Sequence, residues 1–135
     1  MHALLRVIDD LIESDPDSYK RTGNNVRVTV DRFGRTQRIL LARKNNFYVL
    51  TSPVAYVESI AGTDAAERRS LLAHIWSRNA LKPLVILRID GRDRVVGQVF
   101  VPIDQVSPTT IEFYLKNLAR DCDRFEYILT GTDNY

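Results

Sequence analysis

The chain of 135 residues contains little of the chemistry from which metal and covalent sites are built. It has one cysteine, Cys122, and two histidines, His2 and His74. A single cysteine excludes an intramolecular disulfide, and this Cys/His content disfavours a zinc site. The stretch Gly34-Arg35-Thr36 lacks the glycine spacing of phosphate-binding loops. We therefore expect no metal, no cofactor and no catalytic residue.

Long hydrophobic runs are also missing. The most apolar segments, 84–87 and 95–101, are far too short to cross a bilayer. The first residues lack a basic segment followed by an apolar one, which a secretory signal would show. The expectation is a cytoplasmic protein with no membrane insertion.

What is present is typical of a globular chain. Apolar residues make up 44% and charged residues 27% of the sequence, so we expect one folded domain spanning residues 1–135. The net charge is only +2, but it is unevenly distributed. Residues 1–19 hold one arginine against five acids, whereas residues 20–44 hold eight bases against Asp31 alone. The second window is a candidate binding surface.

Hydrophobic periodicity predicts three main helices and five strands. The helices cover 2–14, 63 or 64–78, and a last segment that begins at Ser107-Pro108. Pro53 should end the third strand, and a short helical segment over 54–60 is expected before the central helix. Turns are expected at 31–34, 44–46 and Asp90-Gly91. The strands are expected at 26–30, 36–42, 47–52, 84–89 and 94–101.

All three helices show an apolar stripe, and that of the first consists of Leu4, Leu5, Ile8, Leu11 and Ile12. In the last helix six residues recur at spacings of four and three, a narrow seam of the kind that packs on one neighbour, and Gly131 is placed to end it. The central helix is expected to pack through Leu71, Leu72, Ile75 and Trp76. The seam of the last helix consists of Ile111, Leu115, Leu118, Cys122, Phe125 and Leu129.

The resulting element order is α-β-β-β-α-β-β-α. Strands joined by tight turns must be antiparallel. Helices set between groups of strands favour an α+β two-layer sandwich, in which the helices cover one face of an antiparallel sheet.

The residues that could be catalytic are more simply interpreted as structural. Cys122 lies in the apolar seam and is expected to be a small buried hydrophobe. His74 is expected at the margin of the central helix. The carboxylates Asp121, Asp123 and Glu126 alternate with arginines, which is typical of a solvated, ion-paired helix face.

The basic window, residues 20–44, leaves three interpretations open. Its bases are simply outward positions on strands, or they meet an acidic surface of a protein, or they bind a nucleic acid by phosphate contact and base stacking. Aromatic residues lie within and just after it. The residues that we expect to contact a partner are Phe33, Arg35, Arg38, Phe47 and Tyr48.

Two stretches of the sequence carry a recognisable pattern: one runs from Gly34-Arg35-Thr36-Gln37 to Ser52-Pro53-Val54, and the other covers 113–126. Together they resemble the YbjN family of bacterial proteins, whose helix pattern Asp123, Phe125 and Glu126 match. Cys122 replaces the family's usual small alanine. The resemblance covers about residues 25–130 and implies a fold like that of type III secretion chaperones.

The resemblance implies a binding role and no catalytic residues. Secretion chaperones of this type are homodimers that hold an extended segment of a partner, and related proteins assist assembly elsewhere, for example of the carboxysome shell. We therefore expect a chaperone-like module that binds a peptide tail or an acidic surface of a protein, with nucleic-acid binding by residues 20–44 as the alternative. A homodimer is also expected, with Phe113, Tyr114 and Tyr127 on the last helix as candidates for its interface.

Overall fold

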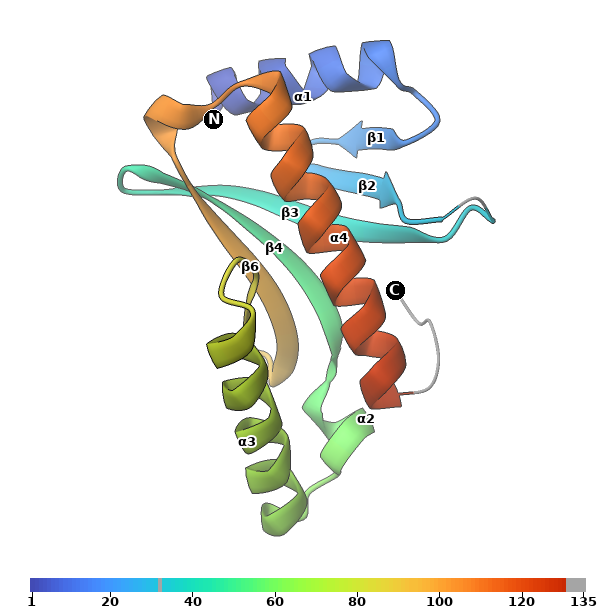
Figure 1. Cartoon of the computed structure of the whole chain (residues 1–135), viewed down its shortest axis with the longest axis vertical. Coiled ribbons are helices and arrows are strands. Elements are labelled where there is room, and N and C mark those ends of the chain that lie inside the picture. Colours follow the sequence, from blue (N-terminus) through green and yellow to red (C-terminus); the bar gives the residue numbers. More distant parts are fainter. Residues whose placement is uncertain (32, 131–135) are drawn as a thin grey trace.

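A computed structural model describes residues 1–31 and 33–130 (Figure 1). One six-stranded sheet forms the centre of the molecule, and its spatial order is β1-β2-β3-β4-β6-β5 with every neighbouring pair antiparallel. The elements are α1 (His2–Ser14), β1 (Tyr19–Thr22), β2 (Asn25–Thr29), β3 (Thr36–Lys44), β4 (Phe47–Tyr56), α2 (Val57–Ala61), α3 (Ala65–Leu81), β5 (Ile86–Ile89), β6 (Arg94–Pro102), a 3₁₀ turn (Ile103–Gln105) and α4 (Pro108–Thr130).

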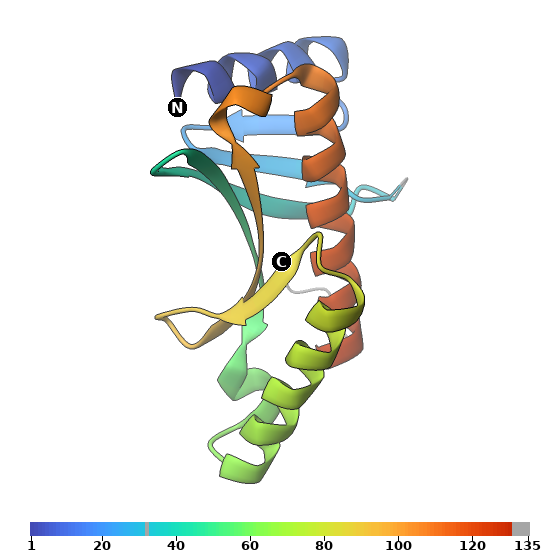
Figure 2. The ribbon, with the colours of Figure 1, turned by 60° about the vertical axis from the view of Figure 1, so that its left-hand side comes forward.

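The helices gather on one side of this sheet. Helix α4 crosses the sheet and contacts β2, β3, β4 and β6, while α1 lies beside β1 and α4 (Figure 1). Helix α3 contacts β5 at the opposite end of the sheet and extends beyond it. In the part of the chain that the structure describes, no helix covers the other face of the sheet (Figure 2). The predicted α+β class is confirmed, with one strand more than the pattern indicated.

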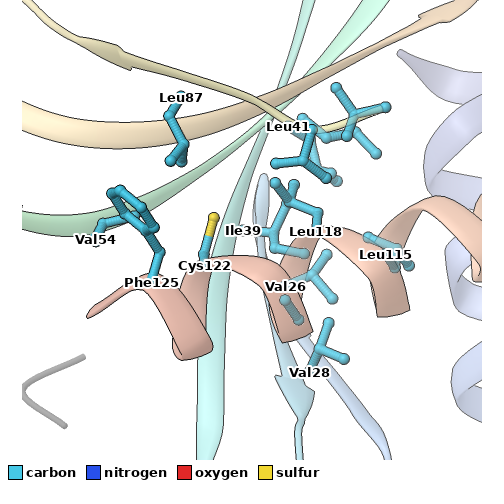
Figure 3. Packing of buried hydrophobic residues seen from close by; sticks show 14 of the residues in the cluster. Val26, Val28, Ile39, Leu41, Val54, Leu87, Leu115, Leu118, Cys122 and Phe125 are labelled. Carbon is cyan, nitrogen blue, oxygen red and sulfur yellow. The ribbon is translucent and has the colours of Figure 1, made fainter. Parts of the chain in front are cut away.

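The core lies between α4 and the sheet. The seam predicted for α4 is confirmed: Ile111, Leu115, Leu118, Cys122 and Phe125 are all buried. Figure 3 shows Leu115, Leu118, Cys122 and Phe125 beside side chains of the sheet, which include Val26, Val28, Ile39, Leu41, Val54 and Leu87. Burial of these side chains is the main stabilising contribution, at roughly 1.5–3 kcal/mol for each large one.

Cys122 is fully enclosed at this interface, as its place in the seam predicted. Burial raises the pKa of its thiol to about 12. Because the thiolate is the reactive form, we expect the native protein to resist a thiol reagent such as dithionitrobenzoate at pH 8 and to react promptly in urea. Fast labelling without denaturant would contradict this packing.

The same shift has a consequence for stability. In the unfolded chain a thiol ionises near pH 8.5, so the contribution of the protonated thiol is complete below that pH and decreases as the pH rises toward 12. Cys122→Ala is therefore expected to flatten the fall in unfolding free energy between about pH 8.5 and 10. Urea titrations of both proteins across this range measure it.

The helices expected to start at residue 63 or 64 and at Ser107-Pro108 begin within two residues of those positions, but Asp64 caps α3 in place of Thr63, the cap that the sequence indicates. The Asp64 carboxylate accepts hydrogen bonds from the N–H groups of Ala66 and Glu67 at 2.7 and 3.2 Å, which caps α3. The Ser107 hydroxyl accepts from Thr110 N–H at 3.2 Å and caps α4. Helix α3 continues three residues past the expected end at Arg78. Gly131, expected to terminate α4, lies outside the described residues.

Only half of the apolar stripe predicted for α3 is buried. Leu71 and Ile75 are buried, but Leu72 and Trp76, which were expected to pack beside them, are 51% and 73% exposed. The reason is tertiary: α3 rests on β5 and on α2 and has no sheet beneath its other side.

Strand β1 was not predicted. It has four residues, Tyr19-Lys20-Arg21-Thr22, of which only Tyr19 is buried, so the usual alternation is too short to detect. A signal was nevertheless present, because Gly23-Asn24 is a typical two-residue hairpin loop and Gly23 has a φ of +59°. The Tyr19 hydroxyl donates to the Glu112 carboxylate of α4 at 2.7 Å and anchors the strand.

The prediction that Pro53 ends its strand is wrong. Strand β4 continues to Tyr56, with a bulge between Pro53 and Ala55 in its pairing with β6. The recorded pairing of β3 with β4 stops at Leu40 and Thr51, so a residue without an N–H is tolerated at position 53. Beyond this point side chains make the hydrogen bonds between β3 and β4. Gln37 Nε2 donates to Ser52 Oγ and to Pro53 O, and Ser52 Oγ donates to Arg38 O. The helix expected over 54–60 accordingly begins only at Val57.

Candidate functional site

The residues expected to contact a partner lie in three different places. Phe33 and Arg35 belong to the turn between β2 and β3, Arg38 and Phe47 point away from α4, and Tyr48 points toward the core. The structure therefore does not bring the five together as one site. Arg32, also in the basic window, lies outside the described residues.

Tyr48 requires a correction, because its side chain is only 3% exposed. Successive strand residues point to opposite faces, so Phe47 and Tyr48 cannot both contact the same partner. Tyr48 is paired with Val101 in the layer under α4, whereas Phe47 is 43% exposed on the opposite face. Of this aromatic pair only Phe47 is part of the surface.

Arg35 connects the turn to the long helix. The Asp31 carboxylate accepts hydrogen bonds from the N–H groups of Phe33 and Arg35 at 2.9 and 3.1 Å, which shapes the turn. The Arg35 guanidinium forms an ion pair with Asp123, a largely buried carboxylate of α4. The two stretches that resemble the YbjN family are therefore in contact in the folded chain, and this contact is structural.

The carboxylates of α4 also have structural roles. Asp121 accepts from Arg78 of α3 at 2.9 Å, and Asp123 and Glu126 are buried. The expectation of a solvated helix face is thus wrong for these two, which lie on the side of α4 that meets the rest of the protein. His74 is exposed, with its ring 5.5 Å from that of Phe125. Within residues 1–31 and 33–130, no three His, Cys, Asp or Glu side chains are placed to hold a metal ion.

The most distinctive surface is the sheet face that points away from α4, which we call the open face. Strand register assigns to it three neighbouring bases, Lys20, Arg27 and Arg38, because Arg27 is paired with Lys20 on one side and with Arg38 on the other. We call these three residues the basic row. All three are exposed, and within residues 1–31 and 33–130 none of them forms an ion pair.

Apolar side chains adjoin the basic row on the same face. Leu40 follows Arg38 by two residues, about 7 Å along β3, and is 48% exposed. Phe47 and Phe100 are 43% and 47% exposed, and their rings meet edge to face with centroids 6.4 Å apart. We call Leu40, Phe47 and Phe100 the apolar group. Of these three, Phe47 and Phe100 are in contact and Leu40 lies on the same face farther along β3, and exposed hydrophobic residues gathered on one face often mark binding surfaces.

The open face carries no acidic side chain on its strands. The outward positions alternate along each strand and follow from the pairing registers. They include Lys20, Thr22, Asn25, Arg27, Thr29, Thr36, Arg38, Leu40, Ala42, Lys44, Phe47, Val49, Thr51, Pro53, Ile86, Arg88, Val96, Gln98, Phe100 and Pro102. Asp17 and Asp31 lie only in the loops at one border, beside Lys20 and Arg27. The charged side chains at these strand positions are therefore all basic, with Asp17 and Asp31 at the border, although the whole chain is close to neutral.

A second exposed surface lies on α3. Leu72 and Trp76 are one helical turn apart on its outward side, and Leu81 at its end is 83% exposed. By comparison, the residues expected at a dimer interface on α4 are less concentrated. Phe113 and Tyr127 are exposed but lie far apart along the helix, and Tyr114 is partly packed on the core.

No helix in the described part of the chain is long and apolar enough to span a membrane. No family model matches the chain, and no curated protein has a similar sequence.

Solved structures do share its fold. A chain of the HopA1–SchA chaperone–effector complex superposes with a TM-score of 0.59 at 10% identity, over 96% of this chain and 94% of that one. The ExoU–SpcU complex of the type III secretion system of Pseudomonas aeruginosa gives 0.57 at 14% identity, over 82% and 87%. The Yersinia pestis type III secretion chaperone SycH, in complex with a fragment of YscM2, gives 0.56 at 16% identity, over 92% and 97%. The fold is thus that of type III secretion chaperones.

Proposed function

We propose that this chain is a non-catalytic, chaperone-like module that binds an extended segment of a partner protein and assists its assembly or holds it before use. The observation that carries the proposal is the open face, a broad sheet surface with exposed apolar and basic side chains and no helix over it in the described part of the chain. Such a surface suits binding of another macromolecule, since exposed apolar patches of this kind mark interaction sites.

The similar folds support a protein as the partner. The HopA1–SchA structure is a chaperone–effector complex, and SycH was solved with a fragment of YscM2. Those partners belong to those proteins. For this chain we carry over only the class of ligand, a segment of another protein that is held without covalent chemistry.

Nucleic-acid binding by residues 20–44 is the second candidate, and the basic row favours it. A single strand would require bases stacked on exposed aromatic rings beside the phosphate contacts. Phe47 and Phe100 pack against each other, and Leu40 stands between them and the basic row in the register. This apolar composition suits a protein segment better than a nucleotide.

We also propose that the chain is related to the YbjN family, which its sequence resembles. Its motif residues Asp123, Phe125 and Glu126 are buried in α4, and Asp123 is joined to Arg35 of the other motif. These residues hold the fold together, so the shared motif implies shared architecture and leaves the partner to be identified. A cytoplasmic assembly role, of which carboxysome-shell assembly is one example, is compatible with this proposal.

Affinity capture tests the function. The tagged chain is used as bait in a lysate of its native cells, and bound proteins are identified by mass spectrometry. Overlapping peptides of the best candidate are then titrated by calorimetry. We expect one partner segment to bind without any covalent change. Absence of a specific partner across several growth conditions, or turnover of a small molecule by the purified chain, would overturn the proposal.

We propose further that the module is a homodimer. Phe113, Tyr114 and Tyr127 are candidates for its interface from the sequence, and the outward side of α3 adds Leu72 and Trp76. Trp76 is the single tryptophan of the chain, so its fluorescence reports on this helix alone.

The two interfaces predict different spectra on dilution. If α3 forms the contact, Trp76 emission should shift to longer wavelength as the dimer dissociates, and Leu72→Ser should yield a monomer. If α4 forms it, Tyr127→Ser should yield the monomer and Trp76 emission should stay constant. Light scattering measures the mass in each case, and a mass of 15.5 kDa at every concentration would exclude the dimer.

A further inference from the structure

We propose that the open face binds an acidic segment whose apolar residues follow its carboxylates, with the carboxylates on the basic row and the apolar side chains on the apolar group. This inference rests on the protein-binding function proposed above and adds the position of the site and the chemistry of its ligand.

Charge complementarity is the first argument. Lys20, Arg27 and Arg38 are neighbours by strand register, and no acid occupies an outward strand position on that face. Three adjacent like charges repel one another, so a negatively charged ligand that lies on them is favoured. The Arg27 guanidinium has only a weak contact with Thr36 Oγ1 at 3.5 Å, which leaves its other donors available to a ligand.

The nearby bases with structural roles provide a contrast. Arg21, on the same strand as Lys20, points to the other side and pairs with Asp9 at 2.8 Å, while Arg35 pairs with Asp31 and Asp123. Arg68, Arg78 and Arg94 are likewise paired with carboxylates. The fold thus neutralises arginines where they join elements together. In the described part of the chain, the basic row receives no such partner.

The apolar group determines the second half of the ligand. Leu40 adjoins Arg38, and Phe100 lies two strands farther on through the pairs Ala42–Val49 and Val49–Phe100. A nucleic acid would place phosphates over the apolar side chains of Leu40, Phe47 and Phe100 as well as over basic residues such as Lys44, the register partner of Phe47. A peptide with carboxylates at one end and apolar side chains at the other matches both parts of the face.

Polar side chains between β4, β5 and β6 limit the site on one side. Arg88 Nε donates to Gln98 Oε1 at 2.8 Å, and Gln98 Nε2 donates to Thr51 Oγ1 at 2.9 Å. These bonds satisfy the groups among themselves, so the expected ligand extends from the basic row toward Leu40 and Phe100 and does not need Arg88.

Fluorescence anisotropy with a designed probe tests the inference. The probe is a short fluorescein-labelled peptide with a run of Glu at one end and a run of Leu and Phe at the other. We expect the wild-type chain to bind it, with affinity that decreases as sodium chloride is added because the basic row is exposed. Arg27→Glu combined with Arg38→Glu should weaken binding by about tenfold or more, and Leu40→Ser should weaken it separately.

The controls distinguish a local site from overall charge. Arg69→Glu combined with Arg92→Glu makes the same change in net charge at exposed positions away from the basic row, and it should bind the probe as the wild type does. A probe with Lys in place of Glu, and another with Ser in place of Leu and Phe, should both bind poorly. Circular dichroism confirms that each variant is folded.

The outcomes that overturn the inference are separate from those that overturn the function. Equal binding of the probe by the Arg27/Arg38 variant, or equal binding of the Lys probe, would overturn it. Tighter binding of labelled oligothymidylate than of the peptide, lost in the same variant, would overturn it in favour of a nucleic acid. A native partner captured equally by the wild type and this variant would leave the chaperone-like function standing and place its site elsewhere.

Discussion

Gly97→Ala is expected to lower the free energy of unfolding by about 3 kcal/mol, as an overpacked core does. Gly97 lies on β6 directly beneath α4, and a Cβ at this position would lie closer to Cys122 Sγ than real atoms approach. The same Cβ would be 3.2 Å from Val85 Cγ1 and 3.4 Å from Leu118 Cδ1. Because the sheet and α4 must separate to admit one methyl group, we expect a large loss, measured by urea unfolding.

A double-mutant cycle attributes this loss to the contact. Cys122→Ala removes the sulfur that the new methyl group meets, at an estimated cost of about 1 kcal/mol by itself. Combined with Gly97→Ala it should restore about half of the stability, so that the two changes are strongly non-additive. Simple additivity would mean that Gly97 is required for another reason. Gly91→Ala is a matched control, since a Cβ there meets no atom within 4 Å.

Asn79→Ala is expected to cost about 2 kcal/mol and to expose the edge of β5. The Asn79 amide donates to Leu87 O at 2.8 Å and accepts from Leu87 N–H at 2.9 Å, so one side chain satisfies both backbone groups that Leu87 directs away from β6. Removing it leaves two partly buried backbone groups without partners, and each unsatisfied group costs roughly 1 kcal/mol or more in stability. Urea unfolding and hydrogen exchange at the Leu87 amide measure the change.

The control variant for this prediction, Asn79→Asp, differs from the wild type by a single heavy atom. Asn79→Asp can still accept from Leu87 N–H but cannot donate to Leu87 O, so it should protect the Leu87 amide better than alanine does and still destabilise the fold. Ser77→Ala, at an exposed position of the same helix, should be neutral. If alanine at position 79 leaves Leu87 exchange unchanged, α3 does not protect this edge.

The β5 edge and the open face differ in what they offer to a partner. A bare strand edge pairs with any extended chain, and here Asn79 occupies the β5 edge by imitating a neighbouring strand. The open face presents side chains instead, whose charge and shape can discriminate between partners. Specific binding through the open face is therefore consistent with a closed β5 edge.

Local patterns in the sequence predicted the elements whose signals are contained within a few residues. Helix α1 has the predicted bounds, because a long amphipathic run and Pro16 define it locally. The start of α4 at Ser107-Pro108, the seam of α4 and burial of Cys122 are also confirmed. Each depends on spacing along one element, which the sequence displays directly.

The predictions that were wrong depended on neighbours distant in the chain. Pro53 lies inside β4 because β3 has stopped pairing there, and Tyr48 is buried because of the register that β4 adopts against β3 and β6. Trp76 is exposed because α3 lies beyond the end of the sheet. None of these facts can be read from the residues on either side.

In the candidate site, too, some features follow from local sequence and others from contacts between distant residues. Residues 20–44 were identified as basic from composition alone, but strand pairing selects Lys20, Arg27 and Arg38 from that window and turns Arg21 and Arg35 toward acids of the helices. Phe100 joins Phe47 from more than fifty residues away. Amino-acid order alone determined which segments are helical or extended and that the chain carries a basic region, because these depend on local spacing. Only the tertiary structure decided which bases remain without an acid and which apolar residues stand beside them, because strand register and the placement of α4 on one face set those distances.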